Sequence, residues 1–211
     1  ADLEGATLPY GYGRRGTPTT RGLEELVSAL EGATRTVLTP SGLSACTAAL
    51  MAVLGAGDHL LMTDSVYDPT RVFCDRILSR YGIAVTYYDP HIGADIAALM
   101  PPNTRAVFVE SPGSLSFEIQ DIPAISAAAH ARGARVLMDN TWATPLYFPA
   151  LARGVDLAIQ SGTKYIGGHS DVMIGAVAAN ADTVRDLKES VFTMGLCVGP
   201  DDMYLALRGL R

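Results

Sequence analysis

The segment that decides the fold is DLAIQSGTKY, residues 156–165, in which a short apolar strand runs into a loop of small residues and a lysine. Its apolar residues are consecutive rather than alternating, as in a strand that is buried on both faces. Six further segments have strand character, and they lie at residues 35–39, 58–63, 84–89, 105–111, 135–139 and 172–179. Apolar strands that alternate with helices predict an α/β fold with a mostly parallel sheet covered on both faces.

Helix-like segments separate these strands. They are predicted from about residue 23, at 44–54, from 68 to about 81, at 94–100, from 121 to about 132, and from about residue 182 onward. Asp68 and Asp121 are predicted N-caps because a proline follows each of them within the first helical turn. Gly82 and Gly133 are predicted to end their helices.

The composition excludes several classes of protein. The chain has 211 residues, a hydrophobic content of 48% and a net charge of −6, which suits one large globular domain and disfavours a nucleic-acid partner. No apolar run reaches the roughly 20 residues of a membrane span, and no signal peptide is visible, so we expect no membrane partner and a cytoplasmic location. Cys46, Cys74 and Cys197 are expected to be buried small hydrophobes, and the four histidines show no ligand spacing, so no metal site is expected.

Ligands of such sheets bind at the carboxyl ends of the strands, where three features stand out. The strand at 35–39 ends in the turn Pro40–Ser44, which could present free N–H groups to a phosphate or be an ordinary strand–helix turn. The strand at 135–139 ends in Asp139, a buried acid that needs a cationic partner such as a ring nitrogen, unless it caps a helix or forms a salt bridge. The third feature is Lys164.

The choice of basic residues singles out Lys164. Only two of the 16 Lys and Arg residues are lysines, so the chain uses arginine almost everywhere for a general positive charge. The other, Lys188, lies in DTVRDLKESV and is expected on a solvated helix face. A lysine can lose its proton and form an imine, whereas an arginine cannot. A phosphate turn, an acid for a ring nitrogen and such a lysine are together what pyridoxal phosphate requires of a protein.

The segment GYGRRG at residues 11–16 fits the G-x-G-x-x-G pattern of a dinucleotide-binding turn. That pattern requires a strand before it and a helix that opens within it. The preceding residues show no apolar alternation, and helical spacing begins only at Leu23. We therefore interpret the segment as something other than a nicotinamide or flavin site.

These motifs together resemble the Cys/Met-metabolism family of pyridoxal-phosphate enzymes and, within it, the bacterial cystathionine β-lyases. The segments that carry the resemblance span the chain: YGRRGTPT (12–19), DHLLMTDSVYDPT (58–70), ESPGS (110–114), MDNTWA (138–143), QSGTKYIGGHSDVMIG (160–175) and LRGLR (207–211). It implies the three-layer αβα large domain of fold type I, with a mixed, mostly parallel seven-stranded sheet. It divides the chain into an N-terminal arm and first helix (1–32), with contacts between subunits, and a cofactor domain (33–211).

The resemblance also implies a role for each matching residue. Lys164 binds the cofactor covalently and acts as the catalytic base, Asp139 pairs with the pyridine nitrogen, and Tyr67 stacks on the ring as a second catalytic residue. The phosphate receives backbone N–H groups from Ser41, Gly42 and Leu43 and hydroxyl groups from Ser161 and Thr163. Tyr12, the third catalytic candidate, and Arg14 contact the cofactor of a neighbouring subunit, which implies a homodimer or homotetramer.

The implied reaction is the β-elimination of L-cystathionine to homocysteine, pyruvate and ammonia. Relatives that act at the γ carbon typically carry YSR and ETP-x-NP where this chain has YGR and ESPGSL, with Ser114 in the place of the asparagine. The alternatives are a methionine γ-lyase, a cystathionine γ-synthase or a cysteine desulfhydrase. Family members are roughly twice as long, so the C-terminal small domain and its carboxylate-binding arginine are expected to be missing. A non-catalytic cofactor-binding fragment is therefore a further alternative.

Overall fold

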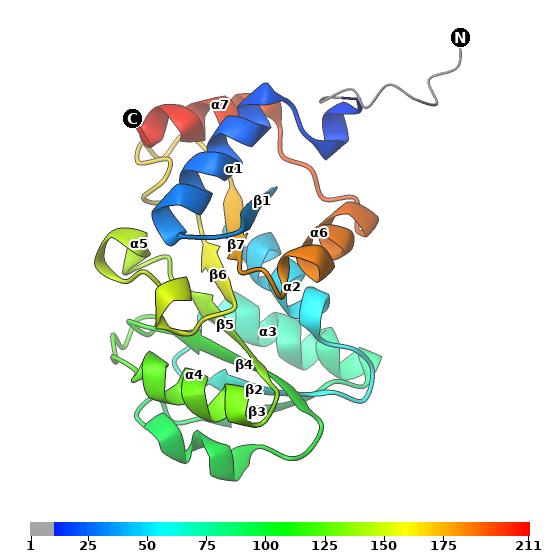
Figure 1. The fold of residues 1–211 in the computed structure, drawn as a ribbon, viewed down its shortest axis with the longest axis vertical. Coiled ribbons are helices and arrows are strands. Elements are labelled where there is room, and N and C mark those ends of the chain that lie inside the picture. The colour runs from blue at the N-terminus through cyan, green and yellow to red at the C-terminus, as the bar shows by residue number, and fades with distance from the viewer. Residues whose placement is uncertain (1–10) are drawn as a thin grey trace.

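The sheet of this chain has seven strands in the order β1-β7-β6-β5-β4-β2-β3 (Figure 1). The computed structural model describes residues 11–211, so the first ten residues of the predicted arm lie outside the described residues. The strands are β1 (Arg35–Thr39), β2 (His59–Thr63), β3 (Ala84–Tyr88), β4 (Thr104–Glu110), β5 (Arg135–Asp139), β6 (Leu157–Gln160) and β7 (Gly175–Ala179).

All neighbouring pairs are parallel except those of β7, which runs antiparallel to both β1 and β6. Because β7 alone is reversed, the carboxyl ends of β1, β6, β5, β4 and β2 lie at one edge of the sheet. The predicted α/β class with a mixed, mostly parallel sheet is confirmed. Asp139, Lys164 and the turn Pro40–Ser44 all stand at or directly after strand ends at this edge.

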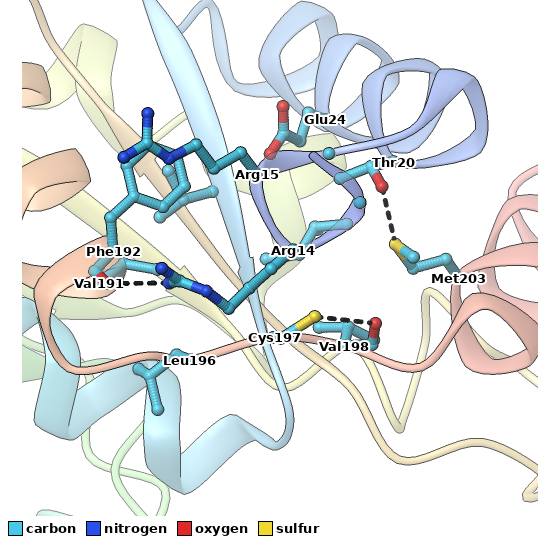
Figure 2. A pocket seen from close by; sticks show the side chains of 14 residues that line it. Arg14, Arg15, Thr20, Glu24, Val191, Phe192, Leu196, Cys197, Val198 and Met203 are labelled. Carbon is cyan, nitrogen blue, oxygen red and sulfur yellow. Dashed lines mark hydrogen bonds between the residues drawn. The ribbon is translucent and has the colours of Figure 1, made fainter. Parts of the chain in front are cut away.

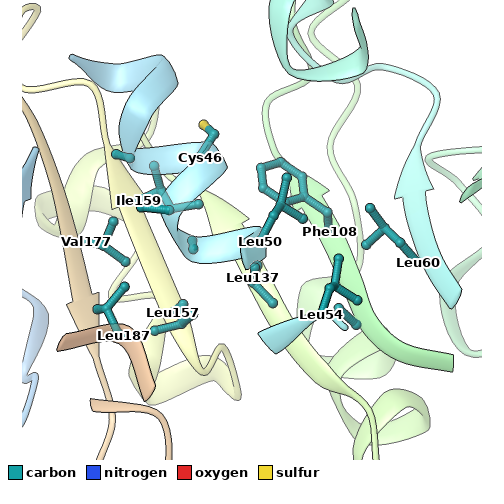
Figure 3. Close-up of a cluster of buried hydrophobic side chains, with 14 of the residues drawn as sticks. Cys46, Leu50, Leu54, Leu60, Phe108, Leu137, Leu157, Ile159, Val177 and Leu187 are labelled. Carbon is teal, nitrogen blue, oxygen red and sulfur yellow. The ribbon is translucent and has the colours of Figure 1, made fainter. Parts of the chain in front are cut away.

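One face of the sheet is covered by α2 (Gly42–Val53), α3 (Asp68–Arg76) and α6 (Val184–Thr193). Helix α2 has apolar residues on nearly all sides because it lies between the sheet and its neighbouring helices, and Leu50 is fully buried. Figure 3 shows part of this core, in which Leu50 of α2 and Leu54, the residue after the helix, point toward Phe108 and Leu137 of the sheet. In each apolar strand, every second side chain points toward this layer of helices.

The opposite face carries α4 (Ile122–Ala131) over its middle and α1 (Pro18–Glu31) with α7 (Pro200–Gly209) over the β1 and β7 side. Helix α1 packs its apolar stripe, which includes Leu23 and Val27, against β1, β7 and α7. The three layers, helices–sheet–helices, are thereby complete. The short elements of the chain are α5 (Thr144–Tyr147) and the 3₁₀ turns η1 (Gly13–Arg15), η2 (Leu78–Tyr81), η3 (Gly93–Leu99) and η4 (Leu151–Arg153).

Several predicted boundaries were wrong for identifiable reasons. Helix α1 begins at Pro18 rather than near Leu23, because Thr17 and Thr20 form a reciprocal capping box that starts the helix on polar residues. Helix α3 has Tyr67 as its N-cap, not Asp68, and its continuation to residue 81 is a separate 3₁₀ turn. The segment after residue 182 forms two helices, α6 and α7.

Other sequence expectations concern burial. Cys46 and Cys74 are buried as expected, but Cys197 is exposed, because it lies in the irregular segment between α6 and α7. Among residues 11–211, no cluster of His, Cys, Asp and Glu has the arrangement of a metal site. No helix in this part of the chain is long and apolar enough to cross a membrane.

Candidate active site

A cleft of about 770 Å³ opens at the carboxyl edge of the sheet. Its wall is formed by the ends of β4 and β5, by Tyr67 directly before α3, and by the loops that follow β4, β5 and β6. Among the residues that line it are Tyr67, Glu110, Asp139, Thr163 and Lys164. Sequence segments more than 90 residues apart thus supply one site, as the rule for parallel sheets predicts.

Lys164 lies in the turn that follows β6, where its N–H donates to the carbonyl oxygen of Ser161 (3.0 Å). Its amine lies 5.6 Å from the centre of the Tyr67 ring. Tyr67 is 42% exposed, so its ring is available to a planar ligand in the cleft. An amine in the cleft and a tyrosine ring beside it suit a planar aldehyde that binds through the lysine.

Asp139 ends β5 with only 9% of its surface exposed. One carboxylate oxygen accepts the backbone N–H of Thr141 (3.0 Å), and the other faces the thiol of Cys46 (3.7 Å). The salt bridge and the helix cap that the sequence left open for Asp139 are not among the interactions of residues 11–211. A buried carboxylate with so few partners fits a cationic ring nitrogen.

The predicted phosphate turn forms the start of α2. Ser41 is the N-cap, and its side chain accepts the N–H of Ser44 (3.1 Å) while its own N–H donates to the Ser44 hydroxyl (2.9 Å). Gly42 and Leu43 begin the helix, and first-turn N–H groups have no partner within a helix. These two N–H groups are therefore the ones free for a phosphate, whereas that of Ser41 is already used in the capping box.

Ser161 and Gly42 lie in close contact, although the chain separates them by more than 100 residues. A Cβ atom added at Gly42 would lie 2.6 Å from the Ser161 Cβ atom, so only glycine permits this approach. The Ser161 side chain is thus placed beside the start of α2, as a phosphate site requires. The Thr163 hydroxyl exchanges hydrogen bonds with the backbone of Ile174 (3.0 and 3.2 Å), and it lines the cleft.

The sequence analysis missed Glu110, which ends β4 beside Asp139 of β5. Its carboxylate accepts the backbone N–H of Tyr67 at 2.8 Å. Burial, and then the negative charge of Asp139, raise the pKa of Glu110 to about 8, although the Tyr67 N–H and the Lys164 amine act in the opposite direction. An acid at the end of a buried strand was the signal that identified Asp139, and Glu110 carries the same signal.

The sequence analysis also missed the aromatic wall of the cleft. The ring of Trp142 lies 5.4 Å from that of Phe117 and 6.2 Å from that of Tyr165, and all three line the cleft. Each of the three is more than half exposed. Trp142 is the chain's single tryptophan, so its fluorescence reports directly on the cleft.

Tyr12 and Arg14 lie away from this cleft within the chain. Arg14 donates to the carbonyl oxygen of Phe192 (2.9 Å) and lines a small cavity of about 40 Å³ between η1, α6 and the segment before α7 (Figure 2). Tyr12 is 59% exposed, and the Arg14 guanidinium lies 5.5 Å from its ring centre. Neither residue lines the cleft that contains Lys164. Within the GYGRRG segment, Gly13–Arg15 form a 3₁₀ turn, and α1 begins only after it, at Pro18.

A family model described as "Cys/Met metabolism PLP-dependent enzyme" matches residues 2–211. The chain belongs to this family. Its cofactor is pyridoxal phosphate, and the residues present fit that group. The close approach of Gly42 to Ser161 shapes a phosphate turn. One oxygen of Asp139 has, among residues 11–211, a thiol as its only hydrogen-bond partner.

Relatives in the family carry out different reactions. The chain is 45% identical to the cystathionine β-lyase MetC of Escherichia coli, across 95% of this chain and 51% of that protein. It is 39% identical to an L-alanine/L-glutamate racemase of Wolbachia pipientis, across 99% of this chain and 51% of the relative. The crystal structure of cystathionine γ-lyase from Lactobacillus plantarum superposes with a TM-score of 0.94 at 30% identity, across all of this chain and 55% of the other. The chain spans about half the length of the relatives that it matches.

Proposed function

We propose that this protein is a carbon–sulfur lyase that cleaves L-cystathionine by β-elimination to homocysteine, pyruvate and ammonia. The observation that carries the proposal is the cleft in which Lys164, Asp139 and Tyr67 meet at the carboxyl edge of the sheet. The similarity to a β-lyase over nearly the whole chain supports the choice of reaction. The site residues assigned in the sequence analysis are part of this proposal, apart from the Ser41 N–H, which donates to the Ser44 hydroxyl.

Pyridoxal phosphate, when bound, accepts the electron pair that the substrate Cα atom keeps after it loses a proton. The Lys164 amine removes that proton as a positioned general base. The Cβ–S bond then breaks, the sulfur leaves with the bonding electrons, and the protonated Lys164 amine returns the proton to sulfur. The three-carbon product reacts with water to give pyruvate and ammonia.

The neighbouring residues hold this arrangement in place. The Asp139 carboxylate, 9% exposed, would keep a bound cationic ring nitrogen protonated, because a nearby negative charge favours the charged form. The start of α2 would hold the phosphate through the N–H groups of Gly42 and Leu43. The Tyr67 ring would stack on the cofactor, and its hydroxyl would be the second group available for proton transfer.

Two positions favour β-elimination over reactions at the γ carbon. Gly13 and Ser114 stand where the γ-acting relatives typically carry serine and asparagine. Ser114 lines the cleft, and its N–H donates to the carbonyl oxygen of Ser65 (2.8 Å), so the loop after β4 is tied to the loop after β2. A substrate in the cleft therefore meets a short hydroxyl at this position rather than an amide.

We further propose that Tyr12 and Arg14 act on the cofactor phosphate of a second subunit. Both lie on η1 or directly before it, outside the cleft of their own chain. A forked guanidinium is suited to a phosphate. A homodimer or a homotetramer built from dimers would bring each pair to the neighbouring site.

Product analysis tests the reaction. With L-cystathionine we expect homocysteine and pyruvate in equal amounts, and the Lys164→Ala variant should produce neither. Lys188→Ala is the matched control, because it removes the chain's only other lysine, and it should keep the wild-type rate. Formation of 2-oxobutyrate would indicate γ-elimination instead, and D-alanine from L-alanine would indicate racemisation; either as the main activity would contradict the proposal.

A further inference from the structure

Glu110 is an ionisable residue of the cleft that has no role in the reaction described above. It is the last residue of β4, in register with Asp139 at the end of β5. In a parallel pair, residues in register point to the same side of the sheet, so the two carboxylates are neighbours. The cleft that contains Lys164 is lined by both of them.

Its most specific contact is with the start of α3. The Glu110 carboxylate accepts the backbone N–H of Tyr67 at 2.8 Å. Tyr67 is the N-cap of α3 and makes no capping hydrogen bond with its own side chain. Helix starts favour a negative charge and an acceptor for their N–H groups. Glu110 supplies the acceptor, and when it is ionised also the negative charge, from a strand that lies 43 positions further along the chain.

This contact constrains the residue whose ring faces the cofactor. Tyr67 has a non-helical backbone (φ −51°, ψ 123°) that directs the chain from the loop after β2 into α3. Its ring is half-exposed in the cleft, 5.6 Å from the Lys164 amine. The hydrogen bond from the Tyr67 backbone N–H to Glu110 therefore fixes the backbone position from which the ring extends.

The charge of Glu110 is the second part of the argument. Four residues from four different elements face it: Asp139 on β5, Lys164 after β6, Tyr67 before α3 and Cys46 on α2. Burial and the Asp139 charge raise its pKa to about 8. Its carboxyl group consequently changes charge close to neutral pH. A cationic ring nitrogen beside Asp139 would favour the ionised form.

We propose that Glu110 is a positioning residue for the cofactor: it holds Tyr67 at the start of α3 and adds a second negative charge beside Asp139. The inference rests on the cofactor site and not on which sulfur amino acid is cleaved. Two variants separate the two roles. Glu110→Gln keeps an acceptor for the Tyr67 N–H but removes the charge, whereas Glu110→Ala removes both.

The test is a titration of the full chain with pyridoxal phosphate, followed by the fluorescence of Trp142, at pH 6.5 and pH 9. At pH 6.5, where wild-type Glu110 is mainly protonated, Glu110→Gln should bind within about threefold of wild type; at pH 9 it should bind about tenfold more weakly, because it lacks the charge. Glu110→Ala should bind about tenfold more weakly at pH 6.5, since the Tyr67 N–H has lost its acceptor, and about 100-fold more weakly at pH 9, since the charge is then lost as well. Glu25→Gln on the exposed face of α1 is the control and should match wild type throughout.

Hydrogen exchange at the Tyr67 amide provides a readout that does not depend on the cofactor. Exchange should be faster in Glu110→Ala than in wild type and nearly unchanged in Glu110→Gln. The inference is overturned if Glu110→Gln keeps the wild-type ratio of affinities at the two pH values, or if Glu110→Ala keeps the protection of the Tyr67 amide. Should Glu110→Ala fail to fold, Glu110→Gln alone decides through the pH comparison. None of these measurements involves cystathionine, so they and the product analysis can fail independently.

Discussion

Replacement of Gly42 by alanine tests whether the start of α2 and Ser161 form one phosphate site. Gly42 has an ordinary helical position, so the reason for glycine here is space and not backbone strain. A Cβ atom at this position would lie 2.6 Å from Ser161 Cβ and 3.0 Å from Ser161 Cα. Carbon atoms in contact prefer about 3.5–4.0 Å, so the two segments must separate by roughly 1 Å.

The expected cost follows from that displacement. Overpacking of this size destabilises a protein by about 1–3 kcal/mol. For a chain of this length, each kcal/mol lowers the melting temperature by about 2–4 °C, so the melting temperature should fall by about 2–12 °C. The shift also moves the helix start away from the Ser161 hydroxyl. Loss of one hydrogen bond to a charged phosphate corresponds to about 10- to 100-fold in affinity for pyridoxal phosphate.

The assay combines thermal unfolding with the Trp142 fluorescence titration. Gly55→Ala is the matched control, because Gly55 follows the other end of α2 and an added Cβ atom would make only an ordinary contact, 3.6 Å from the Asp58 carboxylate. The control should change neither quantity by more than experimental error. If Gly42→Ala binds pyridoxal phosphate as tightly as wild type, the assignment of the phosphate site to this contact is refuted.

Three further predictions follow from the site. Asp139→Asn should lower the rate of pyruvate formation by at least about 100-fold, since the ring nitrogen loses its anionic partner. The control Asp121→Asn keeps a helix cap and should not lower this rate. Equal rates in Asp139→Asn and wild type would exclude the pairing role of Asp139. Arg14→Ala and Lys164→Ala chains, each nearly inactive alone, should regain turnover when mixed and reassembled, because one intact site then forms across the interface; no recovery would place Arg14 elsewhere. In the absence of cofactor, the free energy of unfolding should decrease by about 2–5 kcal/mol between pH 4.5 and pH 8, because folded Glu110 keeps its proton until about pH 8 whereas the unfolded chain releases it near 4.5. Denaturant titrations should show a smaller decrease in Glu110→Gln. A decrease in Glu110→Gln equal to that of wild type would contradict the raised pKa of Glu110.

Much of the fold could be predicted from the sequence because each buried strand is a continuous apolar run bounded by turn residues. Asp139 and Lys164 could be identified for the same reason, since both stand where such a run ends. The direction of β7 could not be derived from its residues, because an apolar run carries no information about which way the strand points. The prediction that the sheet is mixed came from the resemblance to a known family.

The parts that were missed depend on contacts between distant segments. The first turn of α1 is polar and has no apolar periodicity, so only the capping box between Thr17 and Thr20 reveals where the helix begins. The role of Glu110 depends on an N–H group 43 residues away, and the need for glycine at position 42 depends on Ser161. Such pairings are set by the packing of the sheet and cannot be read from local sequence.

The attachment point of the cofactor tests the central claim most directly. The protein would be incubated with pyridoxal phosphate, its visible absorption recorded, the covalent link fixed with borohydride, and the labelled peptide mapped. The account predicts a visible band that borohydride removes and a label on Lys164 alone. A label on Lys188, or no covalent link in a folded protein, would contradict the assignment of Lys164 and with it the proposed lyase chemistry.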